Sequence, residues 1–397
     1  MEQVPTTRVL NLTRLLSRAG RTLTGVDRVE LAYLRRFLTD DTPVFGLIRT
    51  SLGWLLLDRD GMQAFEAAVT TGDWGRRGLL SRLSYRLSAR RQAALSLVRR
   101  HSIRRCRPRG LAGLVAKLGP IDYYSVAHSN LAPAALRPFS REGHRVNVLI
   151  HDIIPLELPQ MQRAGTVAAF RAKIGATIGF ADRIIFNSQD TKDRLDAYVA
   201  DAKLDAYKRA VVAHLGVDLT PPDAASLPKS LDLTRPYFIT VGTIEPRKNH
   251  GLLLDVWEAL GADAPRLFIC GSRGWQNEDV FARLDRGIES VTELSGLSDG
   301  AIAALFQGAH AMLFPSFAEG FGLPPIEAAA LGTPVICGDL AIWREVLGDT
   351  GVYLDVTDRY KWQKAIIKIA EQKNTSPKDK MVAPTWADHF KIVLSMT

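Results

Sequence analysis

The second half of the chain alternates short apolar runs with longer helix-like stretches. Each run is too short for a helix, and the segments between most of them have helical length. This alternation predicts a doubly wound α/β domain built on a parallel sheet. The predicted strands are residues 237–241, 266–270, 291–294, 311–314, 334–337 and 352–354, and the predicted helices are 251–260, 299–307, 326–331, 362–373 and 385–395.

The first half shows the same α/β layering with less regular spacing. Its predicted strands are residues 8–12, 44–48, 54–57, 122–126, 145–150 and 183–186, and its predicted helices are 26–38, 162–180 and 190–199.

A proline- and serine-containing stretch over residues 218–234 lacks any periodicity, which indicates a linker. We therefore predict one Rossmann-like domain over residues 1–220 and a second over 233–375. Residues 376–397 are expected to form a C-terminal helix that packs back on the first domain. A chain of 397 residues also exceeds the usual size of a single core.

The cysteines and the hydropathy exclude several classes of protein. The three cysteines are an odd number without metal-ligand spacing, so neither a disulfide framework nor a cysteine metal site is expected. No stretch of 18 apolar residues occurs, and the first residues lack the apolar core of a signal peptide. We expect a cytoplasmic protein.

The most informative segment is residues 315–332, PSFAEGFGLPPIEAAALG, in which a glycine-containing loop leads into a helix. The two prolines suit a helix start, where the N–H groups they lack are not needed. Free amides at such a start bind phosphate. Glu319 in the loop and Glu327 in the expected first turn can accept hydrogen bonds from sugar hydroxyls. The alternative is a capping loop with two solvated glutamates.

A second loop follows the predicted strand that ends at Gly242. It presents Arg247 and Lys248 just before Asn249, which can cap the next helix. Two cations beside a helix N-terminus suit a diphosphate, because arginine binds it bidentately and lysine acts as a point charge. A lone pair of this kind would more often be a solvated surface turn.

These two segments resemble the retaining GT-B glycosyltransferases of family four, with their glutamate–seven–glutamate motif and GT-x-EPRKN loop. Residues 214–218, 268–275 and 295–316 are similar as well, so the resemblance covers the chain from about 145 to 357. It implies two Rossmann-like domains facing a cleft, a nucleotide-sugar donor held by the second domain, and transfer to a glycan or polyprenyl-linked acceptor. It implies no cofactor and no metal.

The resemblance also implies roles for individual residues. Lys248 would hold the diphosphate with help from Arg247, Glu319 would contact the donor sugar, and Glu327 would hold the ribose hydroxyls. Many relatives carry an arginine where this chain has Thr243, which makes Arg247 the second cation. The other donor-binding residues implied are Gly25, Gly242, Ser298 and the backbone amides of Phe321, Gly322 and Leu323.

The first domain contributes a segment that resembles the HDxxP motif of the family. His151 and Asp152 directly follow the predicted strand 145–150, where the histidine of relatives reaches the donor sugar, so both join Glu319 as candidate catalytic residues. A strand-end histidine with a structural partner, and an aspartate that caps the next turn, are the alternatives. Residues 24–28 resemble the flexible loop whose glycine lets a helix approach the diphosphate.

The net charge of +9 is concentrated in one insertion near residues 76–118. Between Asp73 and Asp122 the chain has twelve arginines, one lysine and no acidic residue. Arginines at every fourth position from Arg82 to Arg90, beside leucines of the same spacing, predict an amphipathic basic helix. Peripheral contact with the inner membrane surface and a solvated or partner-covered helix remain alternatives. No nucleic-acid recognition motif accompanies the charge.

Two further interpretations concern the identity of the donor and the DRD segment at residues 58–60. The resemblance favours GDP-mannose, while UDP-hexoses and dTDP-rhamnose stay open, and a same-fold epimerase or a silent nucleotide-sugar-binding subunit are the rival functions. Residues 58–60, DRD, match the metal-binding motif of another glycosyltransferase fold, but a tight turn that ends at Gly61 is the favoured interpretation. The oligomeric state is not predicted.

Overall fold

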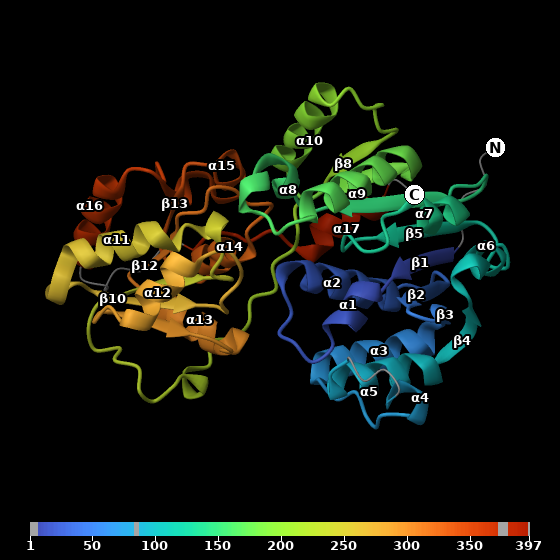
Figure 1. Ribbon diagram of the computed structural model, residues 1–397, viewed down its shortest axis with the longest axis horizontal. Coiled ribbons are helices and arrows are strands. Elements are labelled where there is room, and N and C mark those ends of the chain that lie inside the picture. Colours follow the sequence, from blue (N-terminus) through green and yellow to red (C-terminus); the bar gives the residue numbers. More distant parts are fainter. Residues whose placement is uncertain (1–6, 83–86, 372–379, 396–397) are drawn as a thin grey trace.

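The protein consists of two α/β lobes that lie side by side, as the computed structural model shows (Figure 1). The structure describes residues 7–82, 87–371 and 380–395. Each lobe has one sheet with helices packed on it. Within the described residues, no helix combines the length and the apolar character needed to cross a bilayer.

The first lobe contains an eight-stranded sheet with the order β4-β3-β2-β1-β5-β6-β7-β8. The β2–β3 and β3–β4 pairs are antiparallel and all others are parallel. Only Ser51 and Leu52 join β2 to β3, and a connection this short permits only a hairpin. The strands are β1 (Thr7–Asn11), β2 (Val44–Thr50), β3 (Gly53–Leu57), β4 (Ser102–Cys106), β5 (Ile121–Ser125), β6 (Arg145–Ile150), β7 (Arg183–Phe186) and β8 (Ala210–Val212).

The second lobe contains a six-stranded parallel sheet with the order β11-β10-β9-β12-β13-β14. Its first strand lies in the middle, so the winding direction reverses between β9 and β12. Ligands of doubly wound sheets bind outside the carboxyl ends of the strands at this point. The strands are β9 (Tyr237–Val241), β10 (Arg266–Cys270), β11 (Val291–Leu294), β12 (Ala311–Phe314), β13 (Val335–Gly338) and β14 (Gly351–Leu354). The first four have the predicted bounds.

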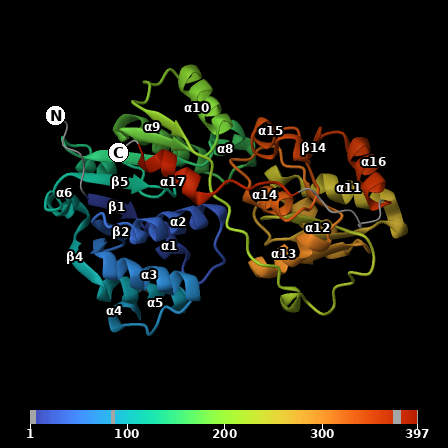
Figure 2. The same ribbon diagram turned by 180° about the vertical axis from the view of Figure 1, so that it is seen from behind.

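The helices cover the sheets of both lobes (Figures 1 and 2). Those of the first lobe are α1 (Thr13–Arg18), α2 (Gly25–Thr39), α3 (Arg59–Thr71), α4 (Leu79–Arg82), α5 (Ala89–Arg100), α6 (Leu111–Val115), α7 (Pro133–Leu136), α8 (Ile154–Glu157), α9 (Thr166–Phe180) and α10 (Gln189–Asp201). Those that follow are α11 (His250–Leu260), α12 (Glu278–Arg286), α13 (Asp299–Gly308), α14 (Leu323–Ala330), α15 (Ala341–Leu347), α16 (Arg359–Ala370) and α17 (Trp386–Leu394).

Helix α17 leaves the second lobe and lies against the first, where Figure 2 shows it beside α2 and α9. The imidazole of His389 is 2.8 Å from the hydroxyl of Tyr33 on α2. The ring of Phe390 meets the same tyrosine edge-on with centroids 4.9 Å apart. The chain therefore returns from the second lobe to the first, where its last helix packs.

The structure corrects the prediction for the basic insertion. Helix α4 ends at Arg82, and Ser88 has extended backbone angles (φ −61°, ψ 157°) before α5 begins. The Ser88 hydroxyl accepts a hydrogen bond from the N–H of Arg91, as an N-cap does. One continuous helix with an arginine stripe from 82 to 90 is therefore wrong, and residues 83–86 lie outside the described part.

The DRD segment also differs from the prediction. Asp58 is the N-cap of α3, and its carboxylate accepts a hydrogen bond from the N–H of Gly61 at 3.0 Å. Gly61 is buried inside the first turn of the helix rather than at the end of a tight turn. The pattern is therefore the start of a helix.

Candidate active site

Two loops meet where the winding of the second sheet reverses. The loop after β9 carries Arg247 and Lys248, and the loop after β12 carries Glu319. Gly242, at the end of β9, has a φ of +144°, and a side chain there would meet the Lys248 stem at about 3.5 Å. The positive φ favours glycine here, while the lysine stem passes over the strand end at an ordinary contact distance.

Glu319 is the centre of a buried charge cluster. One of its oxygens, Oε1, accepts a hydrogen bond from Lys248 Nζ at 2.6 Å and pairs with Arg247 Nη1 at 2.6 Å. Arg247 Nε also contacts Glu245 Oε1 at 2.7 Å. The Lys248 ammonium lies 4.1 Å from the centre of the Phe314 ring. Two cations and two carboxylates therefore balance one another.

The pKa values follow from this arrangement. Burial alone would raise the pKa of Glu319, but the charges and hydrogen bonds of Arg247 and Lys248 lower it to about 2. Burial lowers the pKa of Lys248 to about 8, and Glu319 opposes this shift. Near neutral pH the glutamate is ionised and the lysine is mostly protonated, so both cations are paired with carboxylates in the free protein.

The N-terminus of α14 completes this side of the site. Gly322 is the N-cap with a φ of +76°, and a side chain there would lie 2.0 Å from the Trp343 ring, so only glycine fits. The helix begins at Leu323 and includes both prolines, so Glu327 lies in its second turn. The prediction that Glu327 lies in the first turn is therefore wrong. The free N–H groups of the helix start adjoin the Glu319 loop.

The first lobe faces α14 with the start of α2. Gly25 is the first residue of α2, and a side chain there would lie 3.4 Å from Leu323. Three residues later, Arg28 pairs with Glu327 at 2.7 Å and with Asp299 at 2.6 Å across the lobes. The predicted ribose-binding glutamate is therefore held by an arginine that the sequence did not single out.

His151 and Asp152 lie against Gly320, the residue that follows Glu319. A side chain on Gly320 would lie 2.4 Å from the carbonyl oxygen of His151. The His151 imidazole is buried, and its Nε2 is 2.7 Å from the carbonyl of Val126. Burial lowers its pKa to about 3, so the ring is neutral.

Asp152 has a local hydrogen bond of its own. Its carboxylate accepts a hydrogen bond from the N–H of Ile154 at 3.2 Å, which is the turn-capping alternative left open by the sequence. Burial raises the pKa of Asp152, while the nearby charge of Arg247 opposes the shift. The structure thus brings His151 and Asp152 to the Glu319 loop. The His151 imidazole itself bonds to the Val126 carbonyl inside the first lobe.

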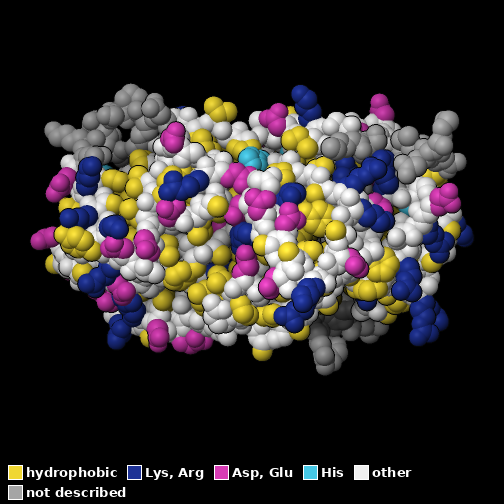
Figure 3. All heavy atoms as spheres, turned by 90° about the horizontal axis from the view of Figure 1, so that it is seen from above, with side chains coloured by type: hydrophobic (Ala, Val, Ile, Leu, Met, Phe, Trp, Pro, Cys, Tyr) yellow, Lys and Arg dark blue, Asp and Glu magenta, His cyan; other side chains and the backbone are white. Residues whose placement is uncertain are grey.

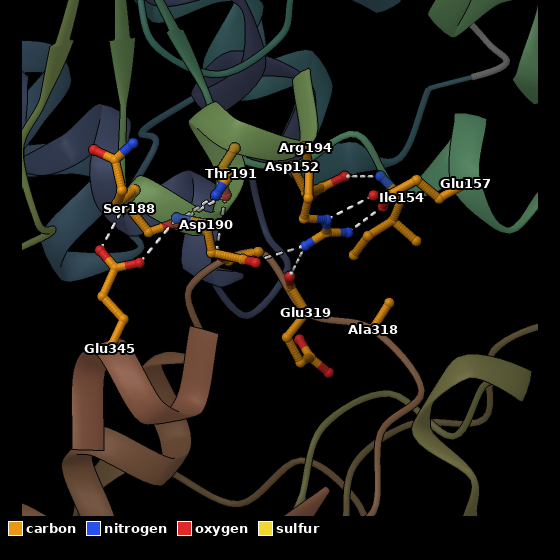
Figure 4. A network of polar contacts seen from close by, with 12 residues as sticks. Asp152, Ile154, Glu157, Ser188, Asp190, Thr191, Arg194, Ala318, Glu319 and Glu345 are labelled. Atoms are coloured by element: carbon orange, nitrogen blue, oxygen red, sulfur yellow. Dashed lines mark hydrogen bonds and ion pairs between the residues drawn. The ribbon is translucent and has the colours of Figure 1, made fainter. Parts of the chain in front are cut away.

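Arg194 on α10 holds the Glu319 loop from the first lobe, and sequence reasoning missed it (Figure 4). Its Nη1 donates to the carbonyl oxygen of Glu319 at 2.8 Å, and its Nε donates to Glu157 at 2.6 Å. Asp190 accepts another of its N–H groups at 3.1 Å. Asp190 lies one turn earlier on the same helix, but Glu157 and Glu319 come from distant segments, so no local pattern could reveal the role.

Glu345 on α15 caps α10 from the opposite lobe. Its two oxygens accept hydrogen bonds from the N–H groups of Gln189 at 2.7 Å and Asp190 at 2.9 Å. It also lies 2.7 Å from Nε2 of His214. Figure 3 views the molecule from above and shows acidic side chains gathered over its middle, where the lobes meet. The carboxylate satisfies N–H groups that a helix start leaves free.

The other predicted residues are spread around this centre. Thr243 is exposed beside the strand end, Ser298 caps α13 by accepting the N–H of Ala301, and Phe321 is buried near the ring of His214. Among the described residues, no three His, Cys, Asp or Glu side chains converge in a way that could hold a metal ion.

Comparison with known proteins identifies the second lobe. Residues 225–382 match the model of the family described as Glycosyl transferases group 1. This lobe is a glycosyltransferase group 1 domain. The buried Glu319 cluster and the α14 start both belong to it.

Curated relatives match about a third to a half of this chain. The Serotype-specific mannosyltransferase WbdA of Escherichia coli is 31% identical over 221 residues, which are 52% of this chain and 27% of that protein. The O-antigen chain mannosyltransferase RfbU of Salmonella typhimurium is 36% identical over 140 residues, 34% of this chain and 38% of that protein. The matched segments thus span well under half the length of either relative.

Solved structures match both lobes of the chain. HepE of Anabaena in complex with UDP-glucose superposes with a TM-score of 0.61 and 16% identity, covering 98% of this chain and 94% of that one. Sucrose-phosphate synthase of Thermosynechococcus elongatus gives 0.58 and 17%, covering 92% and 89%. The predicted GT-B fold is confirmed, with the antiparallel edge of the first sheet as an addition.

Replacing Glu319 tests the charge balance of the cluster. The Glu319→Gln variant leaves Lys248 buried without its carboxylate, so we expect the free energy of unfolding to fall by about 3 kcal/mol. Inorganic pyrophosphate should restore part of this loss, because its charge replaces that of the glutamate. Urea unfolding with and without pyrophosphate measures both effects.

The matched control is Glu293→Gln, which removes a carboxylate from the exposed pair with Arg273. Surface pairs contribute at most about 1 kcal/mol, so this variant should stay near the wild type and show no special response to pyrophosphate. Equal losses in both variants would contradict the account of the cluster.

Proposed function

We propose that the protein is a retaining, metal-independent glycosyltransferase that moves a sugar from a nucleoside diphosphate to a glycan or lipid-linked oligosaccharide during polysaccharide biosynthesis. The observation that carries the proposal is the meeting of Arg247, Lys248 and the free start of α14 at the reversal point of the second sheet. All three adjoin the Glu319 loop, and cations together with the free N–H groups of a helix start suit a diphosphate.

The chemistry needs this charge most when the sugar leaves. Breaking the bond at the anomeric carbon leaves negative charge on the diphosphate, and preorganised cations and N–H groups stabilise it. In the cluster, Glu319 accepts both cations through one oxygen. A diphosphate that bonds Lys248 and Arg247 takes over these contacts and leaves the carboxylate to accept hydrogen bonds from the donor sugar. This charge replaces what a divalent ion supplies in other transferases.

GDP-mannose is the proposed donor, and mannose is the sugar that it transfers. The support comes from the names of the relatives, since both WbdA and RfbU are mannosyltransferases. A UDP-sugar is the main competing donor, because HepE was crystallised with UDP-glucose. Retention of the anomeric configuration is proposed from the resemblance to family four.

Nucleoside diphosphates test the donor and the metal-free site together. We expect GDP to raise the melting temperature more than UDP, dTDP or CDP, and EDTA to leave the shift unchanged. A ligand at 100 times its dissociation constant adds roughly 2.7 kcal/mol of stability, which thermal denaturation resolves. With GDP-mannose, release of GDP should require an acceptor, and NMR of the product should show the donor's anomeric configuration.

The other outcomes separate the rival functions. Release of GDP without acceptor would indicate an epimerase, and binding without release would indicate a silent nucleotide-sugar-binding subunit. An inverted product, or loss of turnover in EDTA, would contradict the mechanism.

Lys248 predicts the pH dependence of donor binding. Bound diphosphate favours the protonated lysine, so GDP affinity is complete below the free-protein pKa of about 8 and falls as the pH rises through it. We expect a loss of about fivefold between pH 8 and 9, because the protonated fraction of Lys248 falls from about one half to about one tenth. The Lys248→Arg variant should lose less than threefold, because arginine stays charged. Calorimetric titration measures the slope, and parallel slopes in both proteins would contradict the assignment.

Peripheral contact with the inner membrane surface is the last part of the proposal. Its support is the exposure of Arg104, Arg107 and Arg109 on and after the edge strand β4, next to Ile103. Vesicles with anionic lipid should sediment the wild-type protein, and Arg104→Ala/Arg107→Ala should weaken this binding. Equal sedimentation by neutral vesicles would argue against it.

A further inference from the structure

A cavity of about 230 Å³ lies in the first lobe between the ends of α1 and α3 and the start of α5. It is lined by the loop that leads from α1 to α2, by Trp74 and by Arg90. Its volume is several times that of a water molecule, about 30 Å³, and below the ~300 Å³ of drug-sized pockets. It has room for a small headgroup and not for an oligosaccharide.

The cavity is positively charged. Arg18, Arg21 and Arg90 line it, and no acidic side chain is among its described lining residues. Arg18 shares the buried carboxylate of Asp27 with Arg14. Arg21 and Arg90 form no ion pair with any residue that the structure describes, which leaves two guanidinium groups for a ligand.

The lining is shaped to hold one of these arginines in place. Gly20 has a φ of +81°, and a side chain there would lie 2.6 Å from Cδ of Arg90. The Arg90 stem therefore lies across the bare backbone of Gly20, and its Nη1 is 3.5 Å from the Gly20 carbonyl oxygen. The indole N–H of Trp74 is buried and donates to no described acceptor.

The loop between α1 and α2 connects the cavity to the proposed donor site. This loop continues into Gly25, which packs against Leu323 at the start of α14. We propose that this cavity binds the phosphate group of the acceptor, an inference that rests on the proposed transferase function. Guanidinium groups bind phosphate bidentately, and two unpaired ones match its double charge.

The test uses the full-length protein saturated with GDP, so that the donor cradle is filled. Farnesyl phosphate is titrated by calorimetry, with farnesol and inorganic phosphate as comparison ligands. We expect binding of farnesyl phosphate and at least a tenfold loss of affinity in Arg21→Ala/Arg90→Ala. The matched control is Arg209→Ala/Arg359→Ala, which removes the same charge from two exposed positions outside the cavity and should change the affinity less than twofold.

Each outcome decides the proposal. Equal losses in the two double variants would show long-range attraction and overturn it, as would equal binding of farnesol. Inorganic phosphate that binds as tightly as farnesyl phosphate would assign the cavity to free phosphate and overturn the acceptor role. Unchanged GDP affinity in the double variant shows that the fold is intact. Gly20→Ala, which displaces the Arg90 stem, should reproduce the loss of farnesyl phosphate binding.

Failure of this inference is distinguishable from failure of the proposed function. If the wild type transfers sugar and the Arg21→Ala/Arg90→Ala variant keeps its acceptor KM, the cavity assignment fails alone. If the wild type transfers no sugar from any nucleoside diphosphate, the proposed function fails and the acceptor role of the cavity falls with it. A rise in acceptor KM at an unchanged donor KM supports both.

Discussion

One carboxylate oxygen of Glu319 holds both Lys248 and Arg247, and the rest of the site is organised around this contact. The three side chains come from loops that follow β9 and β12, so their meeting requires the winding reversal of the second sheet. Burial would make each charge costly alone, and mutual pairing offsets part of this cost. The free protein thus keeps two cations at a place where an anion can replace the glutamate as their partner.

The first lobe holds this cluster in place from the other side. Arg194 bonds the carbonyl oxygen of Glu319, Arg28 pairs with Glu327, and Glu345 caps α10 across the boundary. Each contact joins a charged side chain to a group of the opposite lobe. Glu319 and Glu327, which are proposed to bind the donor, therefore also take part in contacts that set the relative position of the lobes.

Much of the second lobe could be predicted, because strands such as 237–241 and 311–314 are short apolar runs with helices between them. The first lobe was harder. The edge strand β4 reads SIRRC and is mostly exposed, so no apolar pattern announces it. At Ser88 a local hydroxyl–backbone bond begins a new helix within the stretch that the arginine spacing predicted as one helix. At Asp58 the same kind of bond started a helix where a turn was expected.

The sequence by itself determined the two-domain α/β architecture and the local chemistry of the loop–helix segment that carries Glu319, Gly322 and Glu327. These depend on periodicity and on backbone needs that neighbouring residues express. Only the tertiary structure decided which groups are partners: Arg28 for Glu327, Arg194 for the Glu319 loop, and the Val126 carbonyl for His151. The physical reason is that these contacts join residues distant in sequence, and their pairing depends on how the two sheets and their connecting helices pack.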